Sequence, residues 1–62
     1  MIRILYLYKS KKTGKWKEHE FITDDERKAV RFIRKIKSTY GYLFTGLSCL
    51  DSEDYEYIDS RI

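Results

Sequence analysis

The sequence has a single cysteine, Cys49, and therefore cannot form an internal disulfide. Small secreted domains commonly depend on disulfides, so a chain without them fits a reducing compartment. No apolar run approaches the roughly 20 residues of a membrane span. The apolar stretch from Ile4 to Tyr8 is too short for a signal peptide, and no small-residue cleavage site follows it. We therefore expect an unprocessed, soluble, cytoplasmic protein without membrane contact.

Groups of residues that carry catalysis or bind metals are also missing. Nucleophilic catalysis needs a base beside the nucleophile, and Cys49 and His19 are the only candidates for such a pair. We expect Cys49 in the core and His19 on an edge strand, so the two should not meet. One His and one Cys do not make a zinc pattern, and the acidic run 51–56 lacks the glycine and spacing of a calcium loop. The three glycines are isolated, which excludes a glycine-rich phosphate loop. A chain of 62 residues has too few residues to form both a hydrophobic core and the walls of a deep catalytic cleft. We predict no enzymatic activity, no cofactor, no metal and no small-molecule substrate.

What the chain does contain is typical of a folded domain. Hydrophobic residues make up 42% of the sequence, charged residues 37%, and ten residues are aromatic. Such a supply of buriable surface argues against disorder, and the length allows one core. We expect residues 1–62 to form a single compact domain.

The first half of the chain predicts a hairpin and a helix. Residues 2–9 are apolar on both alternating sides, which is typical of a central strand, and residues 15–22 alternate as a charged edge strand. Gly14 suits a left-handed position in the loop between them. Thr23 and Glu26 have the spacing of a capping box for a helix that ends near residue 40, before a left-handed Gly41. Its apolar stripe comprises Ala29, Phe32, Ile33, Ile36 and Tyr40.

The second half predicts two further strands. Residues 42–50 form the third strand, in which Gly46 indicates a bulge or a close approach of backbone. A polar turn at 51–54 precedes an alternating fourth strand at 55–62. The predicted fold is α+β with the order β-β-α-β-β. A four-stranded, mainly antiparallel sheet carries one amphipathic helix on one face.

Alternation along the strands divides the sheet into two faces. We expect the core under the helix to include Leu5, Leu7, Phe21, Leu43, Leu47, Cys49, Ile58 and Ile62. The opposite face is then rich in Tyr and Trp, which are enriched at protein interfaces. We predict that it binds a protein partner or a second copy of the chain through Tyr6, Tyr8, Trp16, Phe44, Tyr55 and Tyr57. The alternative is that the faces are reversed, or that these rings simply lie flat on the surface.

The net charge of +3 is unevenly distributed. Residues 1–50 have twelve Lys and Arg against five Asp and Glu, a net +7, whereas residues 51–62 have one Arg against five acids, a net −4. Cations gather on the first hairpin and on the outer face of the helix, where they could follow a phosphate backbone. The candidate phosphate contacts are Lys11, Lys12, Lys15, Lys17, Arg27, Arg31, Arg34 and Lys35. The alternative is that these cations have no binding role, are simply exposed to solvent, and pair in part with the acidic C-terminal segment.

Two functions fit these patterns. The sequence favours a non-enzymatic protein-interaction module, a small regulator or inhibitor of unknown target such as phages and mobile elements encode. The alternative is a small basic nucleic-acid-binding protein that uses the lysine-rich hairpin and the cationic helix face. The stretch Lys12-Thr13-Gly14-Lys15-Trp16 resembles the hairpin of β-sheet DNA-binding domains attached to phage-type integrases. The predicted order of elements after it departs from that family, so no residue role is carried over.

Overall fold

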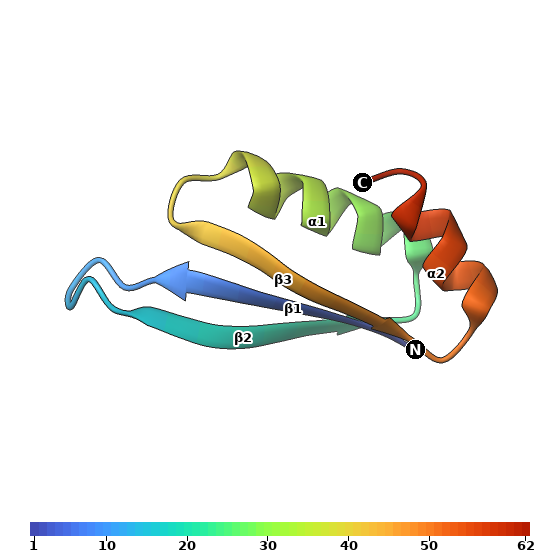
Figure 1. Ribbon diagram of the computed structural model, residues 1–62, viewed down its shortest axis with the longest axis horizontal. Helices are drawn as coiled ribbons and strands as arrows, with labels where there is room; N and C mark the ends of the chain where they lie inside the picture. Colours follow the sequence, from blue (N-terminus) through green and yellow to red (C-terminus); the bar gives the residue numbers. More distant parts are fainter.

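The computed structural model describes all 62 residues and contains three strands and two helices in the order β-β-α-β-α. β1 (Ile2–Lys9) is the central strand, as predicted, and pairs antiparallel with both β2 (Trp16–Thr23) and β3 (Tyr42–Cys49). The chain passes from one edge of the sheet to the other through α1 (Glu26–Ser38). Figure 1 shows that α1 and α2 (Ser52–Asp59) lie on the same face of the sheet, which leaves the other face without a helix.

The hairpin between β1 and β2 follows the sequence prediction closely. Gly14 has a φ of +71°, the left-handed conformation expected of it. Two backbone hydrogen bonds close the loop, one from the amide of Ser10 to the carbonyl oxygen of Lys15 (2.9 Å) and one from the amide of Gly14 to that of Ser10 (2.8 Å). The hairpin extends beyond the end of α1 (Figure 1), so its tip is not covered by the helix.

The predicted capping box at the start of α1 is wrong. Asp25 is the N-cap, and its Oδ1 accepts hydrogen bonds from the amides of Arg27 (2.9 Å) and Lys28 (3.3 Å). Thr23 instead stabilises the turn before the helix, because its hydroxyl oxygen accepts from the amide of Asp25 (3.1 Å). A carboxylate two residues nearer the helix satisfies the free amides directly, and Glu26 becomes the first helical residue.

α1 ends at Ser38, earlier than the sequence predicts. The hydroxyls of Ser38 and Thr39 both donate to the carbonyl oxygen of Lys35, at 3.1 and 2.6 Å. Such local side-chain bonds compete with the helical pattern and satisfy a carbonyl at its end. Tyr40 therefore lies outside the helix and is 94% exposed instead of continuing the apolar stripe. Gly41 has the predicted left-handed conformation, with a φ of +88°.

The predicted bulge in the third strand is present. Leu5 of β1 pairs with Gly46, but the next residue, Tyr6, pairs with Phe44, so Thr45 has no direct partner. One extra residue in β3 shifts the alternation of its side chains between the two ends of the strand. As a result Leu47 and Phe44, three residues apart, both lie toward the helices.

The predicted fourth strand is a helix. Asp51 caps α2 by accepting a hydrogen bond from the amide of Glu53 (2.9 Å), and the acidic residues 53–54 occupy the first turn, where the helix dipole favours them. Ile58 faces the core and is fully buried. The polar turn predicted at 51–54 is thus the beginning of this helix, and the sheet has three strands instead of four.

The core contains seven buried residues, all hydrophobic, and the predicted faces of β1 are reversed. The alternate set of β1 that begins with Ile2 and Ile4 faces the helices, and both isoleucines are fully buried. Leu5, Leu7 and Leu43, which the sequence predicts in the core, lie on the side without helices. Phe21, Leu47 and other members of the predicted core do pack where expected. The complete buried set is Ile2, Ile4, Ala29, Val30, Ile33, Ile36 and Ile58.

We call the helix-free side of the sheet the open face. By the strand register it carries Arg3, Leu5, Leu7, Lys9, Trp16, Glu18, Glu20, Ile22, Leu43 and Ser48. Arg3 and Glu20 form a salt bridge across β1 and β2, with 3.3 Å between nitrogen and oxygen. Neither helix of the protein is both long enough and apolar enough to cross a membrane.

Candidate nucleic-acid interface

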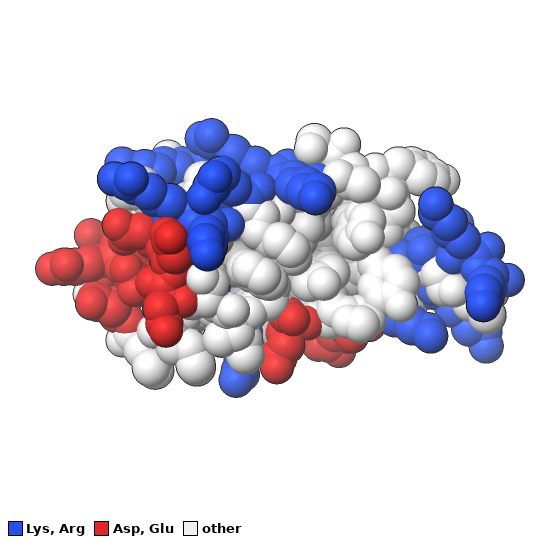
Figure 2. Space-filling model, turned by 180° about the vertical axis from the view of Figure 1, so that it is seen from behind, with Lys and Arg blue, Asp and Glu red and all other residues white.

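Five lysines surround the end of the β1–β2 hairpin, and all five are exposed. The ion pairs in the molecule are Met1 with Asp24 and Arg3 with Glu20, so none of these lysines forms a salt bridge. Figure 2 shows them as a separate positive region at one end of the molecule. Ammonium groups that form no salt bridge are available to an anionic partner. The five are Lys9, Lys11, Lys12, Lys15 and Lys17.

A row of aromatic rings leads from the core to this hairpin on the helix side of the sheet. Tyr6 packs edge-on against Phe32 of α1, with 5.3 Å between ring centroids. Next along the strands, His19 lies 5.9 Å from Tyr6 and 4.6 Å from Tyr8. Tyr42 of β3 is 6.2 and 6.3 Å from the same two tyrosines. The row is therefore anchored in the core at one end and reaches solvent at the other.

The loop between α1 and β3 is held beside the hairpin by its backbone. The amide of Lys9 donates a 2.8 Å hydrogen bond to the carbonyl oxygen of Gly41. Gly41 takes up its left-handed conformation between two tyrosines, of which Tyr40 is 94% and Tyr42 43% exposed. The early end of α1 leaves these rings uncovered, so they stand next to the lysines of the hairpin.

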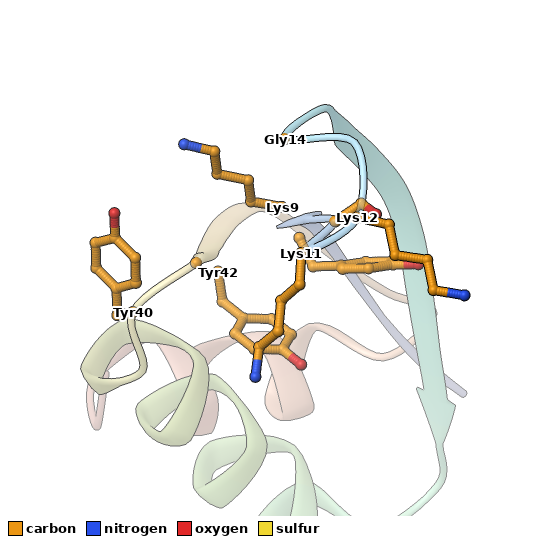
Figure 3. Close-up of a pocket in the computed structure, with 9 residues that line it drawn as sticks. Lys9, Lys11, Lys12, Gly14, Tyr40 and Tyr42 are labelled. Carbon is orange, nitrogen blue, oxygen red and sulfur yellow. The ribbon is translucent and has the colours of Figure 1, made fainter.

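These residues surround one groove with a volume of about 600 Å³. In Figure 3, Lys9 and Lys11 extend on different sides of the space beside Tyr40 and Tyr42, and Lys12 points away from Tyr40. The groove combines aromatic surface with ammonium groups and contains no acidic residue. Its complete lining is Tyr8, Lys9, Ser10, Lys11, Lys12, Gly14, Tyr40, Gly41 and Tyr42.

The second predicted group of phosphate contacts, on the outer face of α1, has different surroundings. The Arg34 guanidinium donates two hydrogen bonds, of 3.1 and 2.8 Å, to the carbonyl oxygen of Arg61, so this side chain holds the C-terminal segment. Arg27, Arg31 and Lys35 are exposed and form no salt bridge. Figure 2 shows, however, that the cations of this helix adjoin the acidic region, whereas the hairpin lies at the opposite end. The hairpin is the stronger candidate for binding a polyanion.

The six aromatic residues predicted to bind a partner do not share one surface. Tyr6, Phe44 and Tyr57 pack against the core, and the ring of Tyr57 is covered by the Arg61 guanidinium at 3.6 Å. Trp16 belongs to the open face and is 49% exposed. The remaining two lie at opposite ends of the molecule, Tyr8 in the groove and Tyr55, 45% exposed, on α2.

Sequence reasoning missed three residues of the groove as site residues, namely Lys9, Tyr40 and Tyr42. A usable signal was present, because Tyr40 and Tyr42 flank a glycine at the end of an amphipathic helix. A helix that stops at such a glycine turns the chain back over its own end. Two aromatic residues at that turn would therefore be left uncovered by the helix, beside the exposed end of the sheet.

The pair considered for nucleophilic catalysis is not assembled. Cys49 pairs with Ile2 near one end of the sheet, whereas His19 pairs with Tyr6 on the opposite edge strand. Burial raises the pKa of the Cys49 thiol, and the charges of Asp54 and Asp51 act in the same direction. A raised pKa disfavours the thiolate, which is the nucleophilic form. No group of three or more His, Cys, Asp and Glu side chains is arranged to hold a metal ion.

Comparison with protein-family models, curated protein sequences and solved structures finds no match to this chain.

Proposed function

We propose that the protein binds nucleic acid, without catalysis, through the end of its β1–β2 hairpin. The observation that supports this most strongly is the groove in which Lys9, Lys11 and Lys12 meet Tyr8, Tyr40 and Tyr42. Lysines supply the salt-dependent attraction to phosphate that dominates nucleic-acid affinity, and exposed rings supply surface on which bases stack. Neither class of residue alone would distinguish this site from ordinary solvated surface.

The distribution of acidic residues also favours this site. An acidic C-terminal segment close to the lysines would repel phosphate. In the folded chain that segment forms α2, and the molecule is 39 Å long with α2 and the hairpin at opposite ends (Figures 1 and 2). This separation exceeds the Debye length of roughly 8 Å at physiological ionic strength. Repulsion from α2 is therefore strongly screened at the groove.

The test is fluorescence anisotropy with labelled single- and double-stranded DNA and RNA at about 50 and 150 mM salt. We expect binding at both salt concentrations and a much lower affinity in the double variant Lys11→Glu/Lys12→Glu. The dependence of affinity on salt should also become less steep, by about one unit of slope for each phosphate that the variant no longer binds. The matched control is Arg27→Glu/Lys28→Glu, which makes the same change in net charge on α1. Equally weakened binding in both variants, or no binding by the unaltered protein at the higher salt, would contradict the proposal.

A second candidate function is protein binding through the open face. Its support is that Trp16, Ile22 and Leu43 are each about half exposed, at 49, 48 and 52%, on a sheet face that no helix covers. A second copy of the chain or another protein would bury this surface. If the chain pairs with itself there, Leu43→Lys makes it monomeric in light scattering, whereas Leu50→Lys, at an 82% exposed position outside the sheet, has no effect. A protein that is monomeric at every concentration would argue against self-association.

A further inference from the structure

We infer that the groove takes an unpaired strand, with bases stacked on Tyr40 and Tyr42 and phosphates at Lys9 and Lys11; this rests on the proposed function. The inference names the form of nucleic acid that the site accepts, which the lysines alone do not determine. A duplex also presents phosphates to lysines, so the distinction depends on the tyrosines.

The exposure of Tyr40 is the first argument. Its side chain is 94% exposed and takes part in none of the aromatic contacts that join the other tyrosines of the groove. A ring held in water on a short loop has both faces free to receive a flat partner. Base–aromatic stacking of this kind contributes about 1–3 kcal/mol per base. The faces of bases in a duplex are already stacked on one another, so only an unpaired base can use this surface.

The support under Tyr42 is the second argument. Its ring lies 6.2 Å from Tyr6 and 6.3 Å from Tyr8, and Tyr6 in turn contacts Phe32 of α1. This chain of rings supports Tyr42 on the side toward the core, while 43% of the residue remains exposed. A ring already held in place loses little conformational freedom when a base stacks on it. Tyr42 thus offers a supported surface for stacking, and Tyr40 a fully accessible one close to it.

The size and lining of the groove are the third argument. Its volume of about 600 Å³ lies within the roughly 300–1,000 Å³ of sites that take drug-sized ligands, the size class of a nucleotide. Lys9 and Lys11 extend on different sides of the space beside the two tyrosines (Figure 3), where phosphates that precede and follow a stacked base would lie. The arrangement matches the general combination of stacking platforms and cations in single-strand binding.

The residues that are missing from the groove point to weak sequence preference. Bases are usually distinguished by Arg, Asn or Gln side chains that form paired hydrogen bonds to base edges. The chain has no Asn and no Gln, and no Arg lines the groove. Stacking and lysine–phosphate contacts are available to every nucleotide. We therefore expect similar affinities for unpaired strands of different sequence, with any difference between DNA and RNA decided by direct comparison.

The experiment uses fluorescein-labelled oligonucleotides of about 12 nucleotides, within the range of site sizes of small single-strand-binding domains. They are a thymidine DNA strand, a uridine RNA strand and a mixed-sequence DNA duplex. Tyr40→Ala is the critical variant, because an exposed side chain without packing partners can be removed without affecting the fold. We expect it to weaken single-strand binding about tenfold with an unchanged salt slope, whereas Tyr40→Phe, which keeps the ring, stays within about twofold of the unaltered protein.

Two controls separate stacking from charge and from general damage. Tyr55→Ala removes a partly exposed tyrosine from α2, at the other end of the molecule, and should leave affinity unchanged. Lys11→Glu should weaken binding and lower the salt slope on single strands by about 0.7. If Lys11→Glu weakens binding but Tyr40→Ala does not, the strand is held by its phosphates alone and the inference fails while the proposed function stands. Tighter binding of the duplex would also overturn the inference. Failure of every oligonucleotide to bind at about 150 mM salt would overturn both.

Discussion

The amide of Lys9, the last residue of β1, donates a 2.8 Å hydrogen bond to the carbonyl oxygen of Gly41, which joins α1 to β3. This single bond ties the loop that carries Tyr40 to the base of the lysine-rich hairpin. The two halves of the groove come from segments about 30 residues apart in sequence, and their relative position depends on the conformation of Gly41.

Gly41→Ala is therefore expected to destabilise the protein by about 1–2 kcal/mol, because a Cβ disfavours the left-handed conformation that Gly41 adopts. Urea denaturation followed by circular dichroism measures the change. Gly46→Ala is the matched control, since Gly46 does not have a positive φ and an added Cβ would meet Leu5 only at ordinary contact distances of 3.5 and 3.7 Å. Equal losses of stability in the two variants would show that the backbone at Gly41 is not under this constraint.

Asp25 should stabilise the fold through its negative charge as well as its cap. The amides of Lys28 and Arg27 donate to its carboxylate and lower its pKa in the folded state. A lowered folded pKa stabilises the protein at pH values above the unfolded pKa, and this contribution is lost as the pH falls through the folded pKa. We expect Asp25→Asn, which keeps a capping oxygen, to lower the urea midpoint at pH 7 and to match the unaltered protein in strong acid. A difference that persists unchanged in acid would mean that charge is not the cause.

Glu26, the next residue, should have the opposite effect. Burial raises its pKa, and a hydrogen bond with Asp54 and the charge of that residue raise it further. A raised folded pKa makes the ionised group unfavourable in the folded state at neutral pH, and the penalty disappears as the pH falls through the folded and then the unfolded pKa. Glu26→Gln should raise the urea midpoint at pH 7 and lose this advantage in acid. A lower midpoint at pH 7 would show that the favourable position of Glu26 at the helix N-terminus dominates.

Arg34 should hold α2 and the C-terminal residues in place. Its guanidinium makes two hydrogen bonds to the carbonyl oxygen of Arg61. We expect Arg34→Ala to destabilise the protein by about 1 kcal/mol and to increase amide hydrogen exchange selectively in residues 52–62. Arg31→Ala, at an exposed position of the same helix without an ion pair, should stay within about 0.5 kcal/mol of the unaltered protein. Uniform exchange changes along the chain would contradict a local role.

Ile58 tests the position of α2 itself. It is fully buried although α2 has only eight residues, so it is the main anchor of this helix in the core. Ile58→Ala should cost about 2–5 kcal/mol, which can unfold a domain of this size outright. Ile58→Val, with an expected loss of about 0.5–1.5 kcal/mol, keeps the measurement possible. Leu50→Ala, at an 82% exposed position, should change the free energy of unfolding little.

The C-terminal segment shows why a short alternating pattern can mislead. Residues 55–62 alternate well enough for a strand, yet Tyr55, Ile58 and Ile62 also have the spacing of one helical stripe. Over eight residues the two periods are difficult to distinguish. The capping geometry of Asp51, followed by two acids in the first turn, was the stronger signal.

The reversal of the sheet faces has a different origin. Both alternate sets of β1 are apolar, and alternation identifies the sets without saying which one meets the helices. In the structure, the set of β1 side chains that faces the helices changes from aliphatic to aromatic along the strand. Ile2 and Ile4 lie under the helices, and Tyr6 and Tyr8 continue the same row to the edge of that cover, where a polar hydroxyl can reach water. The central position of β1, the turn at Gly14 and the bulge at Gly46 were all predictable because local conformation or charge determines them.

The arrangement of charges makes this small protein strongly dipolar along its 39 Å length. At one end, the acids of α2 face the cations of α1 and largely offset their field (Figure 2). At the other end, the hairpin lysines form no salt bridge. A polyanion that approaches from any direction would exert a torque that turns the hairpin toward it before contact. The net charge of +3 therefore understates the attraction at close range, and the first encounter is biased toward the end where the tyrosines stand.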